Sequence, residues 1–119
     1  MTRKAAISLI FVALLTVCNA DESVIEYARV QKAQNLSGVI RDQMGIPIPQ
    51  VAVEEMSDDW STVLQHTMTD TSGHWSLSVL PERRIHHIRL VKAAFHQLRL
   101  HVELKRRATK TLDFQLPVS

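Results

Sequence analysis

The feature that most constrains this chain is a seven-residue segment near its C-terminal end, residues 98–104, with the sequence LRLHVEL. Apolar and polar residues alternate at every position, so a β-strand would place all the apolar side chains on one face. A helix has about 3.6 residues per turn and would spread the same side chains around its circumference. The segment therefore predicts a strand with one buried face and one polar face.

Shorter segments of the same kind follow one another from Asn35 onward, with turn residues between them every 8 to 12 positions. Short strands at this spacing are typical of an all-β sandwich or barrel. Because each strand has one apolar face, two sheets must close over each other to bury these faces. We therefore expect an all-β sandwich of about seven strands. The side chains predicted to face inward are Leu98, Leu100, Val102, Leu104, Leu112, Phe114, Leu116, Trp75 and Leu77.

Two turns between the predicted strands share one local pattern, with aspartate at the first position and glycine at the fourth. They run from Asp42 to Gly45 and from Asp70 to Gly73. The aspartate can accept hydrogen bonds from the amides of its own turn, and the glycine can adopt the positive φ that returns the chain to a strand. We interpret both aspartates as turn residues rather than calcium ligands, because a calcium site needs several converging oxygen ligands.

The first twenty residues have the three-part pattern of a cleaved secretory signal peptide. Arg3 and Lys4 form a basic start, residues 5–17 form an uncharged and mostly apolar run, and small residues precede the charged Asp21. The apolar run has 13 residues. A membrane-spanning helix needs roughly 20, so the run is too short to cross a bilayer.

Cleavage after Ala20 would divide the chain into a signal peptide (1–20), an N-terminal spacer or short helix (21–34) and one folded domain (35–119). We therefore expect a secreted, periplasmic or cell-surface protein without a transmembrane segment in its mature part. An alternative is a bacterial lipoprotein anchored through Cys18, although the residue before this cysteine is larger than such signals usually have. Cys18 is the only cysteine, so the cleaved chain would have neither a disulfide nor a thiolate metal site.

The basic residues are concentrated in the last third of the chain, where residues 82–119 contain nine lysines and arginines against three acidic residues. Such a concentration suits an acidic protein surface, an anionic glycan or a lipid headgroup as partner. The alternative is a solvated face whose charges keep sheet edges from pairing with other chains. Nucleic acid is not expected, because no aromatic residues interleave with the charges. The residues of the predicted binding patch are Arg83, Arg84, Arg99, Lys105, Arg106, Arg107 and Lys110.

Six histidines raise the question of a metal site. His86 and His87 are neighbours on one predicted strand, so they should point to opposite faces and cannot hold one ion together. His74, His87 and His101 would converge only if their strands pair suitably, and the alternative is that they face solvent. No serine lies in a nucleophile elbow. We therefore assign no catalytic residue, no metal site and no cofactor.

Residues 36–53 (LSGVIRDQMGIPIPQVAV) combine a strand, an Asp-x-x-Gly turn, prolines and a second strand, and residues 69–77 (TDTSGHWSL) form a threonine-aspartate, glycine and aromatic hairpin. Together they resemble the carboxypeptidase regulatory-like family, whose fold is the transthyretin-like (prealbumin-type) sandwich. Leu80-Pro81 and the strand from Ile85 to Val91 are similar to the family's next segment. The likeness extends over about residues 36–116. It implies an antiparallel Greek-key topology.

The resemblance also implies an accessory role. Such domains support a neighbouring carboxypeptidase domain or form appendages of bacterial surface proteins, and they contribute no catalytic residues. We therefore expect a non-catalytic exported module with a binding or structural function. The alternative is a small hydrolase of the hydroxyisourate hydrolase type, which shares the fold. Those enzymes end in a Tyr-Arg-Gly-Ser tail, whereas this chain ends in Leu116-Pro117-Val118-Ser119.

Overall fold

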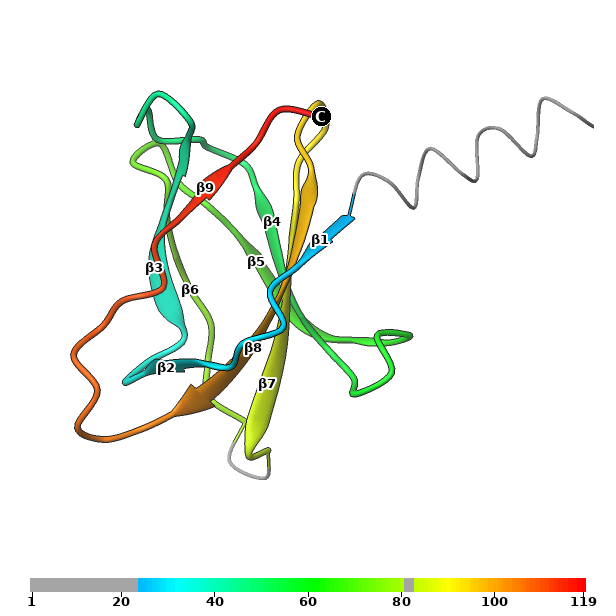
Figure 1. Cartoon of the computed structure of the whole chain (residues 1–119), viewed down its shortest axis with the longest axis vertical. Helices are drawn as coiled ribbons and strands as arrows, with labels where there is room; N and C mark the ends of the chain where they lie inside the picture. Colours follow the sequence, from blue (N-terminus) through cyan, green and yellow to red (C-terminus); the bar gives the residue numbers. More distant parts are fainter. Residues whose placement is uncertain (1–23, 81–82) are drawn as a thin grey trace, which may run out of the picture.

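The computed structural model describes residues 24–80 and 83–119. These residues contain nine strands and no helix. The larger sheet consists of β1 (Val24–Glu26), β2 (Gln31–Ala33), β4 (Ala52–Met56), β5 (Val63–Met68), β7 (Ile85–Val91) and β8 (Gln97–Leu104). The smaller sheet consists of β3 (Ser37–Asp42), β6 (His74–Ser76) and β9 (Phe114–Leu116). Figure 1 shows the two sheets as two layers.

The predicted signal peptide lies outside the described residues. Within the described ranges, no helix has the length and apolar character needed to span a membrane.

One hydrophobic core lies between the two sheets. The inward face of β8 contributes Leu98, Leu100 and Val102, all with no exposed surface, and the smaller sheet contributes Ile40 and Trp75. Burying one such side chain stabilises the fold by roughly 1.5–3 kcal/mol. The predicted inward-facing set is confirmed: six of its members are buried, and the remaining three, Leu77, Leu104 and Phe114, pack against the core as partly buried residues.

The sheet topology corrects the expectation of about seven antiparallel strands. The larger sheet has the order β1-β8-β7-β4-β5, with β2 also paired to β8, and the smaller sheet has the order β6-β3-β9. β1 and β2 run parallel to β8, and β3 runs parallel to β9, so both sheets are mixed.

The additional strands β1 and β2 come from the stretch that was expected to be a spacer or short helix. Each has only three residues, which is too short for an alternating pattern to be recognised. They cover the free edge of β8: the Tyr27 amide donates to the Arg99 carbonyl at 2.9 Å, and the Lys105 amide donates to the Ala33 carbonyl at 2.8 Å. Covering this edge satisfies backbone groups that would otherwise be open to pairing with another chain.

Both predicted aspartate–glycine turns are confirmed. Oδ1 of Asp42 accepts hydrogen bonds from the amides of Met44 and Ile46, each at 2.9 Å. Oδ1 of Asp70 does the same in its own turn, and Gly73 has a φ of +75°. A Cβ at this glycine would lie 2.4 Å from a backbone oxygen of β3, so the turn needs glycine for space as well as for φ.

β7 and β8 pair antiparallel in a register that determines what the outer face of the larger sheet displays. Their inward residues alternate with outward ones in both strands, as the burial pattern shows. On the outward side, His87 lies opposite His101 and Arg89 lies opposite Arg99. The outer face therefore carries a continuous polar surface over the middle of the sheet.

Candidate functional site

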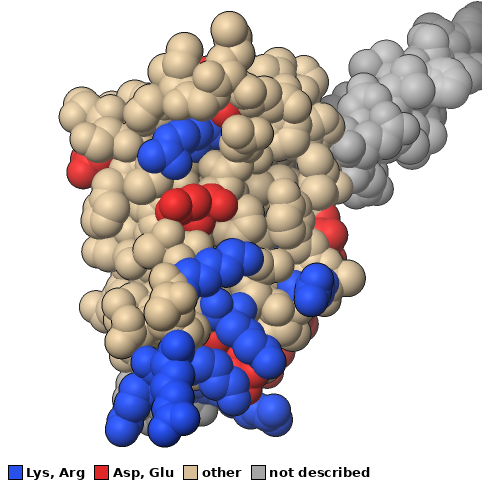
Figure 2. All heavy atoms as spheres, turned by 60° about the vertical axis from the view of Figure 1, so that its left-hand side comes forward, with Lys and Arg blue, Asp and Glu red and all other residues tan. Residues whose placement is uncertain are grey.

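Most of the predicted basic patch lies at one end of the molecule, where β8 leads into the loop 105–111. The lysine and arginine side chains of this loop are exposed. The parallel pairing of β2 with the last residues of β8 brings Arg29 and Lys32 to the same end. Figure 2 shows lysine and arginine side chains gathered there. We call the following seven exposed residues the basic end: Arg29, Lys32, Arg84, Lys105, Arg106, Arg107 and Lys110.

A hollow of about 500 Å³ lies within the basic end, and its lining includes the side chains of Arg29, Lys32 and Lys110. The Lys110 ammonium donates to Oε1 of Gln31 at 2.9 Å, which ties the loop to β2. Cations that approach one hollow from different chain segments create a local positive potential, which favours an anionic group between them.

Glu103 reflects this positive potential. Its carboxylate lies 3.4 Å from the Lys105 ammonium and 3.6 Å from the Arg84 guanidinium. Burial acts to raise the pKa of Glu103, but the hydrogen bond from Lys105 and the charges of Lys105, Arg84 and Lys32 outweigh burial and lower this pKa below its usual range. The carboxylate therefore stays ionised and neutralises part of the basic end.

Two residues of the predicted patch lie elsewhere in the structure. Arg83 is only 22% exposed and forms ion pairs with Asp58 and with the buried Glu55. Arg99 lies on the outer face of the larger sheet, where its guanidinium carbon is 4.9 Å from the centroid of the Trp60 ring. Both guanidinium groups thus have partners within the chain, whereas the other five predicted residues belong to the basic end.

The loop between β4 and β5, residues 57–62, reaches the outer face of the larger sheet. The Asp59 carboxylate accepts hydrogen bonds from the hydroxyls of Ser61 at 2.6 Å and Ser57 at 2.8 Å. These bonds, with Ser61 contributing most, lower the pKa of Asp59 to about 2. They hold Trp60 at a φ of +64°, a conformation that costs a non-glycine residue about 1–3 kcal/mol. The hydrogen bonds of the loop therefore offset the unfavourable backbone conformation of Trp60.

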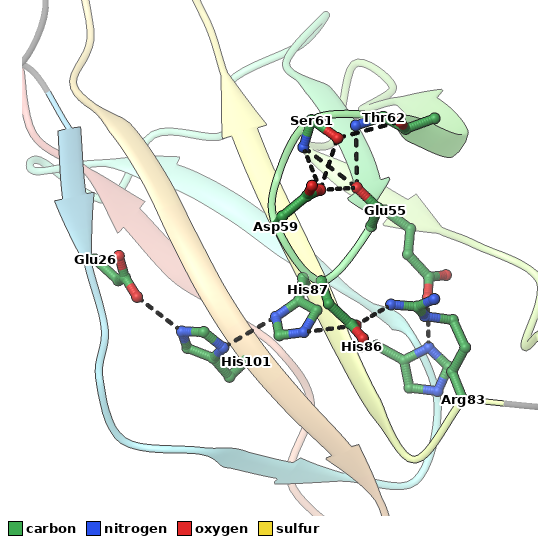
Figure 3. A network of polar contacts seen from close by, with 11 residues as sticks. Glu26, Glu55, Asp59, Ser61, Thr62, Arg83, His86, His87 and His101 are labelled. Carbon is green, nitrogen blue, oxygen red and sulfur yellow. Dashed lines mark hydrogen bonds and ion pairs between the residues drawn. The ribbon is translucent and has the colours of Figure 1, made fainter.

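Trp60 packs edge-on against two histidines that face each other across β7 and β8. The Nδ1 atoms of His87 and His101 are 3.1 Å apart (Figure 3). Nε2 of His87 lies 3.2 Å from the Asp58 carboxylate, and Nε2 of His101 lies 2.9 Å from the Glu26 carboxylate. Burial, followed by the nearby charge of His101, lowers the pKa of His87 below its usual range. We call these two residues the histidine pair.

The structure brings together only two of the three histidines considered for convergence. His74 lies on β6 in the smaller sheet and is exposed. In the part of the chain that the structure describes, no group of three or more histidine, cysteine, aspartate or glutamate side chains is suited to hold a metal ion. A hollow of about 410 Å³, lined partly by Asp58 and Arg83, borders His87.

His86 points into the molecule, so the prediction that His86 and His87 face opposite ways is confirmed. Its Nδ1 lies 2.7 Å from the carboxylate of Glu55, and both side chains are essentially unexposed. The amide of Gln65 donates to the other oxygen of Glu55 at 2.8 Å. Glu55 lies two residues after the buried Val53 and therefore faces the same side of β4, opposite the buried Ile88 of β7. A bulge in the β4–β5 pairing follows it, between Glu55 and Met56.

The sequence did not predict the contacts of Glu26 and Glu55. Glu26 and His101 are 75 residues apart in the chain, and no local pattern indicates such a pairing. Glu55 stands in an acidic dipeptide that reads as exposed, although its position two residues after Val53 places it on the buried face of β4. A signal did exist for the loop itself, because serine and aspartate at residues 57–61 (SDDWS) are typical of turns held by side-chain hydrogen bonds.

Comparison with known proteins adds no relative: no family model matches the chain, and a search of curated proteins finds no match. The resemblance to the carboxypeptidase regulatory-like family therefore stays a prediction. The arguments for function rest on the geometry of the basic end and the histidine pair.

Proposed function

We propose that this chain is a non-catalytic exported β-sandwich module, of the Greek-key transthyretin-like type, that binds an anionic glycan through its basic end. The export rests on the signal-peptide pattern of residues 1–20, and the module type rests on the resemblance described above. The observation that carries the binding role is the gathering of seven exposed cations from three separate chain segments at one end.

The charge of the basic end is only partly neutralised from within. In the described part of the chain, the ion pairs of its seven cations go to one carboxylate, that of Glu103, which Arg84 and Lys105 share. Arg83, Arg89 and Arg99, by contrast, are each engaged with an acidic or aromatic side chain on the sheet. Cations left without an internal partner are the ones available to an external anion.

An anionic glycan fits this end better than a lipid surface does. Protein elements that lie in the membrane interface combine cations with apolar side chains that enter the bilayer, and both contribute to the strength of binding. Among the described residues, the large exposed hydrophobic side chains number eight, and one of them, Val30, lines the hollow of the basic end. A chain carrying repeated sulfate or carboxylate groups needs no apolar contact, because it pairs with cations spread along a loop and a hollow.

Retention of the purified protein on a heparin matrix over a salt series tests this proposal. Exposed charges are screened within about 8 Å at physiological ionic strength, so retention should be strong at low salt and fall steadily as salt rises. Reversing Lys105, Arg106 and Arg107 together to glutamate should abolish retention. The fold should remain intact, because these loop side chains are exposed.

A matched pair of single reversals provides the control. Arg106→Glu lies in the basic end, whereas Lys92→Glu lies in the turn after β7, at the opposite end of the sheet. Arg106→Glu should elute at clearly lower salt than Lys92→Glu. Equal elution of the two variants, or no retention of the native protein at low salt, would refute glycan binding by the basic end. Stronger binding to acidic phospholipid vesicles than to heparin would refute the choice of a glycan.

A further inference from the structure

The two neutral rings of the histidine pair lack a hydrogen-bond donor between their Nδ1 atoms. Each Nε2 faces a carboxylate, which is only an acceptor when ionised, so each Nε2 must carry a proton to form a hydrogen bond there. A neutral imidazole has a single N–H. With both rings neutral, the two Nδ1 atoms therefore present lone pairs to each other at 3.1 Å. That arrangement is repulsive unless a cation lies between them.

We propose that the Nδ1 atoms of His87 and His101 bind one divalent transition-metal ion, with Cu²⁺ as the preferred ion. Imidazole nitrogen is a common ligand for copper, zinc and nickel, and affinities for such ligands peak at Cu²⁺ in the divalent series. Two protein ligands do not fill the coordination sphere of such an ion, so water or a small external ligand completes it. This inference is independent of the glycan-binding role of the basic end.

The distance between the two nitrogens suits shared coordination. Metal–imidazole bonds are about 2.0–2.1 Å long. With bonds of this length, nitrogens 3.1 Å apart subtend an angle of roughly 100° at the metal. That angle lies between the values of square-planar and tetrahedral geometry, which Cu²⁺ and Zn²⁺ respectively favour. The direct cross-strand register of His87 and His101 on the sheet holds both rings in place without a metal.

The carboxylates behind the rings match the usual surroundings of metal-binding histidines. Such histidines almost always donate their second N–H to a carboxylate, a backbone carbonyl or water, which fixes the tautomer and makes the metal-facing nitrogen more basic. Asp58 and Glu26 occupy these positions from two different elements, the loop 57–62 and β1. They also offset the positive charges of Arg83 and Arg99, which lie on the same side of the sheet.

A shared proton is the cation that competes for the position between the two Nδ1 atoms. The side chains of His87 and His101 retain 13% and 19% exposure, and the 410 Å³ hollow borders His87, so both rings keep contact with solvent. Metal and proton therefore compete for one position, and metal affinity should fall as the pH is lowered.

Calorimetric titration of the purified, metal-free protein with CuCl₂ at neutral pH tests the proposal. We expect one Cu²⁺ per chain, and at least a tenfold loss of affinity in both His87→Gln and His101→Gln. His66→Gln is the matched control, because this exposed histidine lies on the edge strand β5 and should bind as the native protein does. Cu²⁺ quenches nearby indole fluorescence, so binding should quench Trp60, and Trp60→Phe should lose this quenching while keeping the stoichiometry.

Nitrogen NMR of the histidine rings provides a second readout that does not depend on the variants folding. On addition of Zn²⁺, which is diamagnetic, the Nδ1 signals of His87 and His101 should shift together while their Nε2 signals remain protonated. Absence of stoichiometric binding, or equal affinity in the histidine variants and the native protein, would overturn the proposal. A shared titration of the two rings that metal ions leave unchanged would assign the position to a proton alone and would overturn it equally.

Discussion

His86 and His87 are neighbours in the chain, yet β7 directs them into two different environments. His86 lies inside the molecule against Glu55, with both side chains almost completely buried. His87 lies on the outer face against His101, under Trp60 and partly open to solvent. Nδ1 of the inner histidine faces a carboxylate, whereas Nδ1 of the outer one faces another imidazole nitrogen. The inner contact is suited to stability, and the outer contact is suited to binding.

The difference follows from what each partner can supply. Glu55 is an acceptor, so a single N–H from His86 satisfies the contact, and the amide of Gln65 satisfies the second carboxylate oxygen. A neutral His101 has one N–H donor and one acceptor nitrogen. The donor lies on Nε2, where it bonds to the Glu26 carboxylate, so Nδ1 is left as an acceptor. The hydrogen bond between His86 and Glu55 is therefore complete within the fold. The two Nδ1 atoms of His87 and His101 instead need a cation from solution between them.

The largest effect is expected at the inner contact. Glu55→Ala removes one partner of a buried pair and leaves the Nδ1 of His86 without its carboxylate, which typically costs about 3–5 kcal/mol. Gln65 keeps its hydrogen bond to the Ser78 carbonyl. Denaturant unfolding should therefore show a large drop in the free energy of unfolding. The neighbouring Glu54→Ala breaks the half-buried ion pair with Arg89, at 2.7 Å, and should cost only about 0–1 kcal/mol. Similar losses in both variants would show that the inner pair is not the stabilising one.

The second prediction compares the two faces of β8. Leu100 has no exposed surface, and Leu100→Ala should cost about 2–5 kcal/mol through lost burial and a residual cavity. The measurement is again the free energy of unfolding from denaturant titration. Substitution of the outward neighbour Arg99 should cost much less. If Leu100→Ala had as small an effect as a substitution on the outer face, the core would be more loosely packed than the structure describes.

The third prediction concerns Arg99 itself. On sequence grounds, Arg99→Ala should change stability by less than about 0.5 kcal/mol in the absence of a specific partner. The structure gives it one, because its guanidinium lies over the Trp60 ring. Partly exposed cation–π contacts contribute about 0.5–1 kcal/mol, and we expect a loss of that size. A double-mutant cycle with Trp60→Ala measures the coupling directly, and strict additivity of the two losses would exclude the contact.

Much of the fold could be predicted because its determinants are local. The alternation in residues 98–104 indicates which side chains of β8 are buried, and the Asp42 and Asp70 turns follow from side-chain hydrogen bonds within four residues. The parallel pairings of β1 and β2 could not be predicted, since three-residue strands have no pattern of their own. The burial of Glu55 was not predicted either: it lies two positions after the inward Val53, but a carboxylate is rarely buried without partners, and its partner His86 comes from another strand.

The candidate site, too, has a part that could be predicted from the sequence and a part that depends on strand pairing. The loop cations from Lys105 to Lys110 are adjacent in sequence, and the structure keeps them together. Arg29 and Lys32 join them only through the pairing of β2 with β8. The histidine pair depends on the register of β7 and β8, which sets His87 opposite His101 rather than one residue away. A shift of one residue in this register would turn one ring to the other face and separate the pair.

The smallest predicted effect is the pH dependence of stability that His87 contributes. Its pKa in the folded protein is lowered from the ordinary value of 6.5, first by burial and then by the charge of His101, so the unfolded chain binds this proton more readily than the folded one. Stability should therefore be fully present above pH 6.5 and should fall as the pH drops from 6.5 toward the lowered folded value.

The groups that face the ring act in opposite directions. Asp58 opposes the lowering of the His87 pKa, whereas Arg83 reinforces it. Denaturant unfolding of native protein and His87→Gln between pH 5 and pH 8, in the presence of a chelator, isolates this contribution, because His86 is common to both proteins. We expect a shallower decline of stability below neutral pH in the variant. A steeper decline in the variant would mean that Asp58 holds His87 as a cation, and the position between the two Nδ1 atoms would then already be filled by a proton at neutral pH.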